Sequence, residues 1–189
     1  MLGPWLSGEK VNLRPLRDGD TIRRVEWLND RETVRLFTGS EPIRAYERVD
    51  GERWLQTLEA DLTAFVWAVE TREHRHIGDV DLHNMDRQSG LAKLTILIGD
   101  KAFWNCGYGT DAVKTLLRYA FSELALESVG LRVYGFNKRA IRCYEKCGFI
   151  QVGAASRDDR TASGPAEIWM TITKDRFFVE NPDASAIHT

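Results

Sequence analysis

The chain of 189 residues is long enough for one domain and too short for two of ordinary size. Hydrophobic residues make up 43% and charged residues 29%, a composition typical of folded globular proteins and unlike that of disordered chains. The formal net charge of −2 gives no chain-wide attraction for polyanions, so we expect no nucleic-acid partner. No apolar run approaches the roughly 20 residues of a membrane helix, and the N-terminal segment becomes charged too early for a secretion signal, so we expect a cytoplasmic protein with no membrane partner.

The first half of the chain predicts one strand followed by helical segments. Apolar and polar residues alternate in the strand, and apolar residues recur at helical spacing afterwards. The dipeptide Asp50-Gly51 is a potential break in the second helix. These elements are expected as a strand at 11–16, a helix at 22–28, a brief turn at 32–37 and a helix from Pro42 to about Leu62.

A β-meander is predicted next, because β-branched and aromatic residues dominate three consecutive runs at 65–70, 76–83 and 91–98. From Tyr108 the pattern changes to a period of 3.6 with a broad apolar face, which predicts a long helix to about Leu124. The remaining elements are expected as a strand at 129–136, a helix at 138–146 that Gly148 ends, and strands at 149–152 and 167–172.

This order of elements predicts a mixed sheet with helices on its faces, an α+β or α/β sandwich. No repeat, linker or change of composition marks a second domain, so we expect one domain over residues 1–175 and a flexible tail at 176–189. The three cysteines, Cys106, Cys143 and Cys147, are an odd number without paired zinc spacing. We expect them to be reduced thiols at packed positions, and we expect no metal site.

The most informative segment, residues 98–111, joins a predicted buried strand to the long helix through Gly107 and Gly109. Glycines let backbone amides approach a ligand closely, and the start of a helix adds unpaired N–H groups and the positive end of its dipole. The segment therefore suits a phosphate group, although a plain turn also uses glycine. It lacks the Gly-Lys-Ser/Thr of a P-loop and the third glycine of a dinucleotide fingerprint, which excludes both motifs.

A second segment, Asn137-Lys138-Arg139-Ala140-Ile141-Arg142-Cys143-Tyr144-Glu145-Lys146-Cys147-Gly148-Phe149, completes a recognisable pair. Together the two segments resemble the GNAT superfamily of acyl-CoA-dependent N-acetyltransferases, with its Arg/Gln-x-x-Gly-x-Gly/Ala loop and its later Asn…Tyr-Glu-Lys-x-Gly-Phe helix. Trp27-Leu28-Asn29-Asp30 and Tyr119-Ala120-Phe121 are similar to the branch of ribosomal-protein N-terminal acetyltransferases and spermidine acetyltransferases. The resemblance extends from about Val11 to Ile172.

The resemblance implies a mostly antiparallel central sheet with helices on both faces, and a splay between the strands that carry Ile98 and Val133. It also implies acetyl-CoA as the acyl donor, with the pyrophosphate on the loop amides and the pantetheine arm along the end of the strand at 97–99. The residues expected to contact the cofactor are Leu97, Ile98, Gly99, Trp104, Asn105, Cys106, Gly107, Tyr108, Gly109, Thr110, Asn137, Arg139 and Tyr144.

Several of these positions have alternative explanations. Tyr144 is expected as the phenol that protonates the departing thiolate, but it also suits packing on the sheet. Asn137 is expected to bond the pantetheine or merely to cap its helix, and Arg139 to contact phosphate or only solvent. Trp104 stands where the superfamily usually has Arg or Gln, and it also suits a hydrophobic cover over the loop. Where the branch often has Gly-Lys, this chain has Asn105-Cys106, so the loop has one positive side chain fewer.

The acceptor amine must lose a proton before it attacks, so a base is expected near the splay. In the strand that contains Asp79, Asp81 and His83, the period of two puts these three side chains on one face. We predict Asp81 as the base and His83 as the second choice, against the alternative of a solvent-facing polar strand.

The sequence thus predicts an N-acetyltransferase that moves an acetyl group from acetyl-CoA to a primary amine by direct transfer in a ternary complex. A non-catalytic CoA-binding or regulatory module with the same fold is the alternative. The acceptor stays open between a protein N-terminus, a polyamine and an antibiotic-like amine, and a homodimer is compatible with the sequence.

Overall fold

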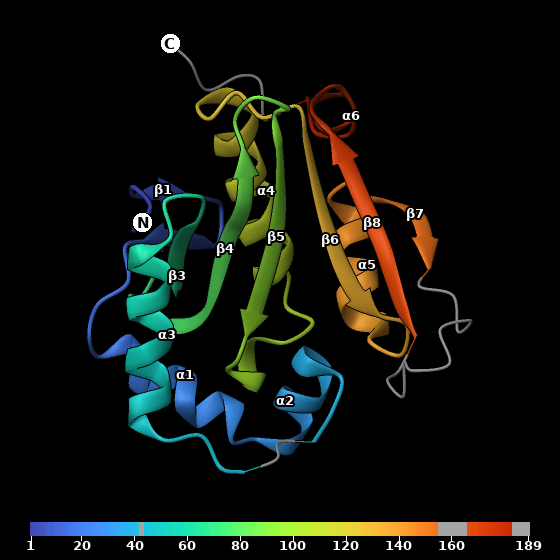
Figure 1. The fold of residues 1–189 in the computed structure, drawn as a ribbon. Helices are drawn as coiled ribbons and strands as arrows, with labels where there is room; N and C mark the ends of the chain where they lie inside the picture. The colour runs from blue at the N-terminus through green and yellow to red at the C-terminus, as the bar shows by residue number, and fades with distance from the viewer. Residues whose placement is uncertain (42–43, 155–165, 183–189) are drawn as a thin grey trace.

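The computed structural model describes residues 1–41, 44–154 and 166–182. An eight-stranded sheet has the order β1-β2-β3-β4-β5-β6-β8-β7 (Figure 1). Its neighbouring strands are antiparallel except β5 and β6, which are parallel, and this confirms the predicted mixed, mostly antiparallel sheet. The strands are β1 (Leu6–Ser7), β2 (Val11–Arg14), β3 (Phe65–Thr71), β4 (His76–Asp86), β5 (Leu91–Ile98), β6 (Ser128–Tyr134), β7 (Ile150–Ala154) and β8 (Glu167–Thr173).

Helices cover both faces of the sheet, as expected for an α/β sandwich (Figure 1). Helices α1, α2 and α3 lie on the face nearer the viewer in Figure 1, and α4 and α5 lie behind the sheet. No helix among the described residues has the length and apolar character that crossing a bilayer requires. The helices are α1 (Asp20–Leu28), α2 (Arg31–Thr38), α3 (Arg48–Ala60), α4 (Tyr108–Ser122), α5 (Lys138–Lys146) and α6 (Lys174–Glu180), with a 3-10 turn at Lys101–Phe103.

The core lies mainly between α4 and the sheet. The apolar face predicted from the period of 3.6 is the buried face of α4, where Leu116, Leu117 and Phe121 are fully buried. Burying a side chain of this size contributes about 1.5 to 3 kcal/mol. This packing fixes the start of α4 relative to the end of β5, where the glycine-containing loop lies.

A splay separates β5 from β6 in the centre of the sheet. The two strands are paired only where Leu91, Ala92 and Lys93 face residues 128–130, and no pairing extends toward Ile98. Each strand keeps an antiparallel partner on its outer side, β4 for β5 and β8 for β6. The sheet therefore opens between two strands that are each held in place from outside.

Two helices differ from the sequence prediction. Residues 31–38 form α2 where a brief turn was expected, because the Asp30 side chain accepts a hydrogen bond from Thr33 N at 2.9 Å and caps the helix. Helix α3 begins at Arg48, and the predicted start at Pro42 lies outside the described residues. Gly51 does not break α3, because it is a helical residue that lies against α1.

The expectation of a loose tail is wrong for residues 176–180, which form most of α6. Thr173 caps this helix by accepting a hydrogen bond from Arg176 N at 3.4 Å. Phe177 is fully buried and lies 5.5 Å from Phe121 between ring centroids. The second half of the expected tail, residues 183–189, lies outside the described residues.

Candidate functional site

The loop between β5 and α4 presents a row of backbone amides. Asn105 and Gly107 have φ values of 61° and 88°, in the left-handed region that Asn and Gly adopt most readily. In the described part of the chain, no acceptor bonds the backbone N–H groups of residues 105–110. Because these N–H groups precede or begin α4, they combine unpaired donors with the positive end of the helix dipole. The geometry required for phosphate binding is therefore present.

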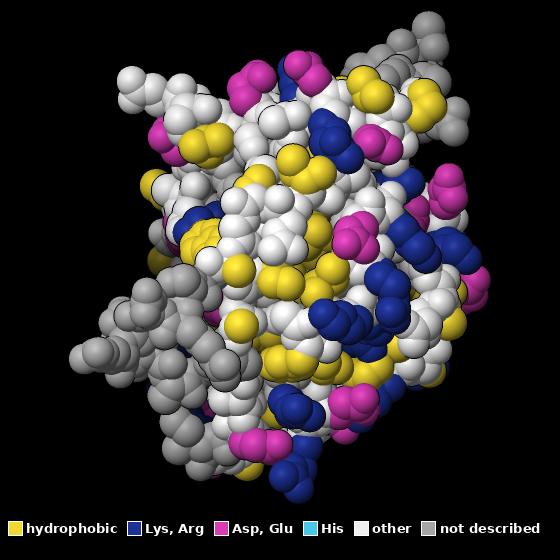
Figure 2. Space-filling view, turned by 90° about the vertical axis from the view of Figure 1, so that its right-hand side faces the viewer, with side chains coloured by type: hydrophobic (Ala, Val, Ile, Leu, Met, Phe, Trp, Pro, Cys, Tyr) yellow, Lys and Arg dark blue, Asp and Glu magenta, His cyan; other side chains and the backbone are white. Residues whose placement is uncertain are grey.

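These amides border a cleft of about 320 Å³ at the splay. Its walls come from β5, β6, the start of α4, α5 and the inner face of α2. Lys and Arg side chains gather on this side of the molecule next to exposed hydrophobic surface (Figure 2), and Arg139, Arg142 and Lys146 of α5 line the cleft. Thr33, Leu36 and Phe37 of α2 also line it, and sequence analysis missed them because α2 itself was not predicted.

Trp104 and Arg139 form a stacked pair at one side of the cleft. The indole Nε1–H donates to Ile98 O at 2.6 Å, and the guanidinium lies 3.3 Å from the centre of the indole ring. Partial burial lowers the pKa of Arg139 from its usual value. Trp104 thus fastens the loop to the end of β5, in agreement with a covering role, and it holds Arg139 at the cleft wall by a cation–π contact.

The backbone at the end of β5 is only partly available to a ligand. Gly99 N donates to Ile77 O at 3.0 Å, so its N–H is engaged with β4, and a contact between Gly99 and pantetheine stays a prediction. Successive residues of a strand point their backbone groups to opposite sides, so Leu97 also faces β4 while Ile98 and Ile96 face the splay. Trp104 engages the carbonyl of Ile98, and Ile96, which sequence analysis did not include, also lines the cleft.

Asn137 is the N-cap of α5 and also ties α5 to α2. Its Oδ1 accepts from Ala140 N at 3.1 Å, and its Nδ2 donates to Leu36 O at 3.1 Å. The side chain lines the cleft and is nearly fully buried. The capping alternative is therefore present, and a bond from Asn137 to pantetheine stays a prediction, for which one N–H and one lone pair of the side-chain amide are still available.

Tyr144 lies on α5 at the floor of the same cleft, with 6% of its surface exposed. Its ring packs on Phe149 at 5.8 Å between centroids. No hydrogen bond engages its hydroxyl within the described ranges. Burial, with a smaller effect from neighbouring Cys143, raises the pKa of Tyr144 well above its usual value. The phenol therefore stays protonated at neutral pH and is free to donate a hydrogen bond into the cleft.

The cysteines are free thiols, and Cys143 lines the cleft. Thr110 Oγ1 donates to Cys143 Sγ at 3.4 Å, and Cys147 Sγ donates to Thr110 O at 3.6 Å. The two α5 thiols therefore join α5 to the first turn of α4, the packing role that their spacing predicted. Cys106 is exposed on the loop, so the expectation of a packed position is wrong for this cysteine.

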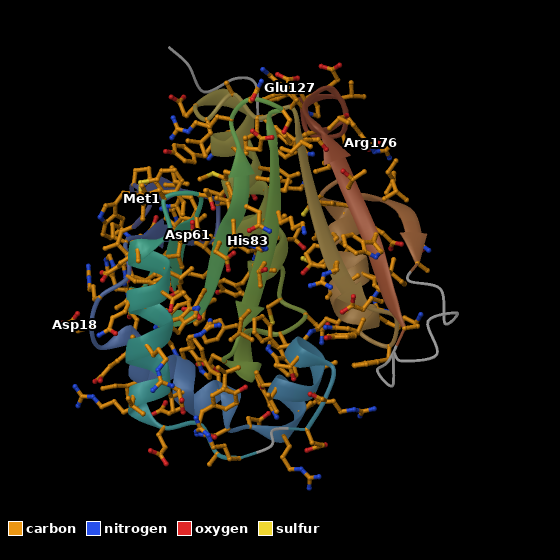
Figure 3. All side chains as sticks on the ribbon, in the orientation of Figure 1. Met1, Asp18, Asp61, His83, Glu127 and Arg176 are labelled. Carbon is orange, nitrogen blue, oxygen red and sulfur yellow. The ribbon has the colours of Figure 1, made fainter. Side chains whose placement is uncertain are left out.

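A second cleft, of about 240 Å³, adjoins the first on the face that carries α1 to α3. His83 lines it, and Figure 3 shows His83 near the middle of the sheet. His83 Nδ1 is 2.7 Å from Asp81 Oδ1, and the Asp81 side chain is only 18% exposed. Burial raises the pKa of Asp81 despite the neighbouring imidazole. The structure thus brings the two predicted base candidates together, with His83 in the cleft and Asp81 beside it.

Asp79, the third polar residue of this face, takes no part in either cleft. It is buried and paired with Arg24 of α1. Trp27 packs edge-on against His76, and the Arg24 guanidinium lies 3.8 Å from the centre of the Trp54 ring. Both tryptophans therefore pack against neighbouring side chains, and neither lines one of the two clefts.

Comparisons with known proteins agree with this geometry. A family model described as an acetyltransferase (GNAT) domain matches residues 10–150. An uncharacterized prophage-derived N-acetyltransferase of Bacillus subtilis is 31% identical over 150 residues, which are 79% of this chain and 81% of that protein. Human α/β-tubulin-N-acetyltransferase 9 is 29% identical over 163 residues, which are 80% of this chain and 77% of that protein.

The fold is also found among solved structures. The crystal structure of spermidine N-acetyltransferase from Vibrio cholerae in complex with CoA and spermine matches with a TM-score of 0.76. The match covers 89% of this chain and 98% of that one at 22% sequence identity. At this identity the likeness establishes the shared fold.

Proposed function

Because this chain belongs to the GNAT family of N-acetyltransferases, we propose that it transfers the acetyl group of acetyl-CoA to a primary amine by direct attack in a ternary complex. The observation that carries the proposal is the row of unengaged amides at residues 105–110, which opens onto the cleft at the β5–β6 splay. An anion at these amides gains both hydrogen bonds and the helix dipole.

The residues of the cleft fit the parts of acetyl-CoA. The amides of residues 105–110 hold the diphosphate, and Arg139 and Arg142 add positive charge beside it. The backbone of Ile96, which faces the splay, bonds the pantetheine amides in the manner of an added strand. Bound acetyl-CoA supplies the activated acetyl group. The missing lysine at Asn105-Cys106 is compensated in part by the cations of α5.

Two groups of the chain handle the protons. His83 takes the proton of the attacking amine, and Asp81 holds the imidazole in the tautomer that accepts at Nε2. Tyr144 donates its proton to the departing sulfur, a role supported by its unengaged hydroxyl in the cleft. General acid and base groups of this kind each contribute roughly 10²- to 10⁴-fold to the rate.

The acceptor is assigned only as a primary amine. The relatives named above act on different amines, tubulin in one case and spermidine in another. Peptide N-termini, polyamines and antibiotic-like amines are all compatible with transfer at the splay. A dimer is compatible with the fold and is not required by either cleft.

Acetyl-CoA binding and turnover are measured separately to test the proposal. We expect acetyl-CoA to raise the melting temperature and a panel of amines to release free CoA thiol. Tyr144→Phe should keep the thermal shift and lose turnover by roughly 10²- to 10⁴-fold. Tyr119→Phe, which alters a half-buried tyrosine of α4 outside both clefts, is the matched control and should retain both.

Two results would contradict the proposal. No thermal shift at millimolar acetyl-CoA would argue against the donor site itself. A thermal shift with no turnover on any amine would instead favour the non-catalytic CoA-binding module.

A further inference from the structure

The second cleft begins where β5 and β6 separate. At that point its polar side chains come from residues that are directly paired across neighbouring strands. His83 of β4 is the direct cross-strand partner of Lys93 of β5, and Lys93 is paired in turn with Gly130 of β6. Side chains of directly opposed residues have Cβ atoms about 5 Å apart. A molecule that reaches His83 therefore passes within contact distance of Lys93.

A second cation lies on the other wall of the cleft. Arg132 of β6 and Lys93 lie 5.4 Å and 5.8 Å from the centre of the same indole ring, that of Trp169 of β8. Arg132 is 3.2 Å from Glu167, but Lys93 has no carboxylate within ion-pair distance in the described part of the chain. The cleft lining thus carries two cations and one carboxylate, and with the Asp81 carboxylate beside His83 these charges balance. Lys93 is the cation that has no carboxylate partner among the described residues.

Gly130 of β6, the cross-strand partner of Lys93, presents no side chain beside it. A Cβ atom at this position would meet only Met170 O, at 3.8 Å, so packing does not require a glycine here. Its φ is not in the left-handed region either. A larger side chain at this position would lie beside Lys93, its partner in the parallel pairing.

We propose that the acceptor amine carries a carboxylate close to its amino group, which Lys93 and Arg132 bind while His83 receives the amine. This inference rests on the proposed transferase function and narrows its substrate class. A polyamine places its further positive charges against these two cations, and like charges at such distances repel. A carboxylate next to the amine instead supplies the ion-pair partner that Lys93 lacks among the described residues.

The carboxylate can belong to an acidic peptide or to a small amino acid, and the experiment separates these sources. Two short peptides are compared that differ only in an aspartate or an asparagine next to the N-terminal residue. 4-Aminobutyrate is compared with butylamine in the same way, and spermidine is added as the polycationic acceptor. kcat/KM is measured by release of CoA thiol, and the affinity for each peptide is measured by calorimetry.

We expect the acidic peptide to exceed its amide counterpart by roughly ten-fold in kcat/KM and in affinity, with spermidine well below both. Lys93→Gln should reduce that preference to about three-fold, mainly through KM. Arg48→Gln removes an equivalent exposed cation from α3, far from the cleft, and should leave the preference intact. A preference for 4-aminobutyrate over both peptides would identify the small-molecule source.

Failure of this inference is distinguishable from failure of the transferase function. Equal use of the two peptides and of the two small amines, or spermidine as the best acceptor, would overturn the inference while transfer itself stands. If no acceptor is acetylated, the transferase function fails. The peptide affinities measured by calorimetry then test the anionic acceptor by themselves. Equal affinity for the two peptides would overturn the anionic acceptor in that case as well.

Discussion

His83 is a partly exposed histidine whose ring has a hydrogen-bond partner at only one of its two nitrogens among the described residues. Its Nδ1 is 2.7 Å from Asp81, and Nε2 has no partner among the described residues. A carboxylate that accepts from Nδ1–H selects the tautomer in which Nε2 is free to take a proton. Burial raises the pKa of Asp81, so this carboxylate takes up a proton at a higher pH than an ordinary aspartate and then ceases to orient the ring.

This pair predicts a specific pH dependence. kcat/KM should fall as the pH is lowered, beginning above the ordinary aspartate range near about 4. His83→Gln should lose roughly 10²- to 10⁴-fold at neutral pH and recover toward wild type above the pKa of the acceptor, where water has already removed the proton. Asp81→Asn, which acts through His83, should lower the rate at neutral pH by a smaller factor and show the same recovery. His74→Gln changes an exposed histidine outside both clefts and should leave the profile unchanged; an unchanged profile for His83→Gln would refute the role.

At the residue scale, the sequence predicted which face of a strand a side chain occupies but not how deeply that side chain is buried. Strand alternation correctly put Asp81 and His83 on one face, because the period of two needs only the sequence. It could not show that Asp81 lies beside His83 at the edge of a cleft, since burial depends on neighbours from other elements. The same limit applies to Gly99, because its amide direction depends on pairing with Ile77 of β4.

At the scale of elements, α3 contains a glycine in its interior where the neighbouring helix α1 packs closely against it. Gly51 is buried, and a Cβ atom there would lie 2.9 Å from the backbone carbonyl of Thr21 in α1. A backbone carbonyl cannot move away from an added methyl group as the end of a flexible side chain can. The sequence suggested a helix break at Asp50-Gly51 because propensity favours one, whereas the contact between α1 and α3 makes the glycine a requirement of packing.

Gly51→Ala should therefore destabilise the protein although alanine is the better helix former. The propensity gain of about 1 kcal/mol is opposed by about 1 to 3 kcal/mol of overpacking. Gly19→Ala is the matched control, since a Cβ atom there meets nothing within 4 Å, and it should be neutral or slightly stabilising. Urea unfolding of both variants measures the difference. A more stable Gly51→Ala protein would show that the contact between α1 and α3 has room for the added methyl group.

Strands and the long helix were the most predictable elements, because their apolar periods were continuous. The meander and α4 follow the patterns at 65–98 and from Tyr108. Helices α2 and α6 were missed because each is short and depends on its cap and on tertiary burial, as Asp30 and Phe177 show.

At the scale of the whole molecule, a buried ionic network joins the N-terminal segment to the sheet. The guanidinium of Arg14 in β2 donates to both carboxylate oxygens of Asp20 in α1, at 2.7 Å and 2.9 Å, and to Glu70 in β3 at 2.8 Å. All three side chains are almost completely buried. This network helps to hold α1 on the face where the second cleft opens, and no local pattern in the sequence pointed to it.

The network predicts how the protein responds to acid. Burial is the largest single effect and would raise the pKa of Asp20 and of Glu70. The hydrogen bonds and charge of Arg14, together with those of other neighbouring groups, hold both pKa values below normal. A carboxyl with a lowered folded-state pKa contributes stability above its unfolded value of about 4, and this contribution is lost as the pH falls through the folded value. The free energy of unfolding should thus be steady near neutral pH and decline from about pH 5 downward.

Glu70→Gln isolates one part of this response. Without the Glu70 charge the variant should be less stable than wild type at pH 7 by about 1 to 3 kcal/mol, because Arg14 keeps only Asp20 as a charged partner. The difference should shrink as the pH falls toward about 3, since Glu70 of the wild type is then being protonated while the amide of the variant does not titrate. Urea unfolding at a series of pH values measures both curves, with Glu59→Gln on the exposed side of α3 as the control. Curves for wild type and Glu70→Gln that stay parallel over this whole range of pH would show that Glu70 does not contribute to acid sensitivity, since a charge that stabilises the fold must lose its effect when it is neutralised.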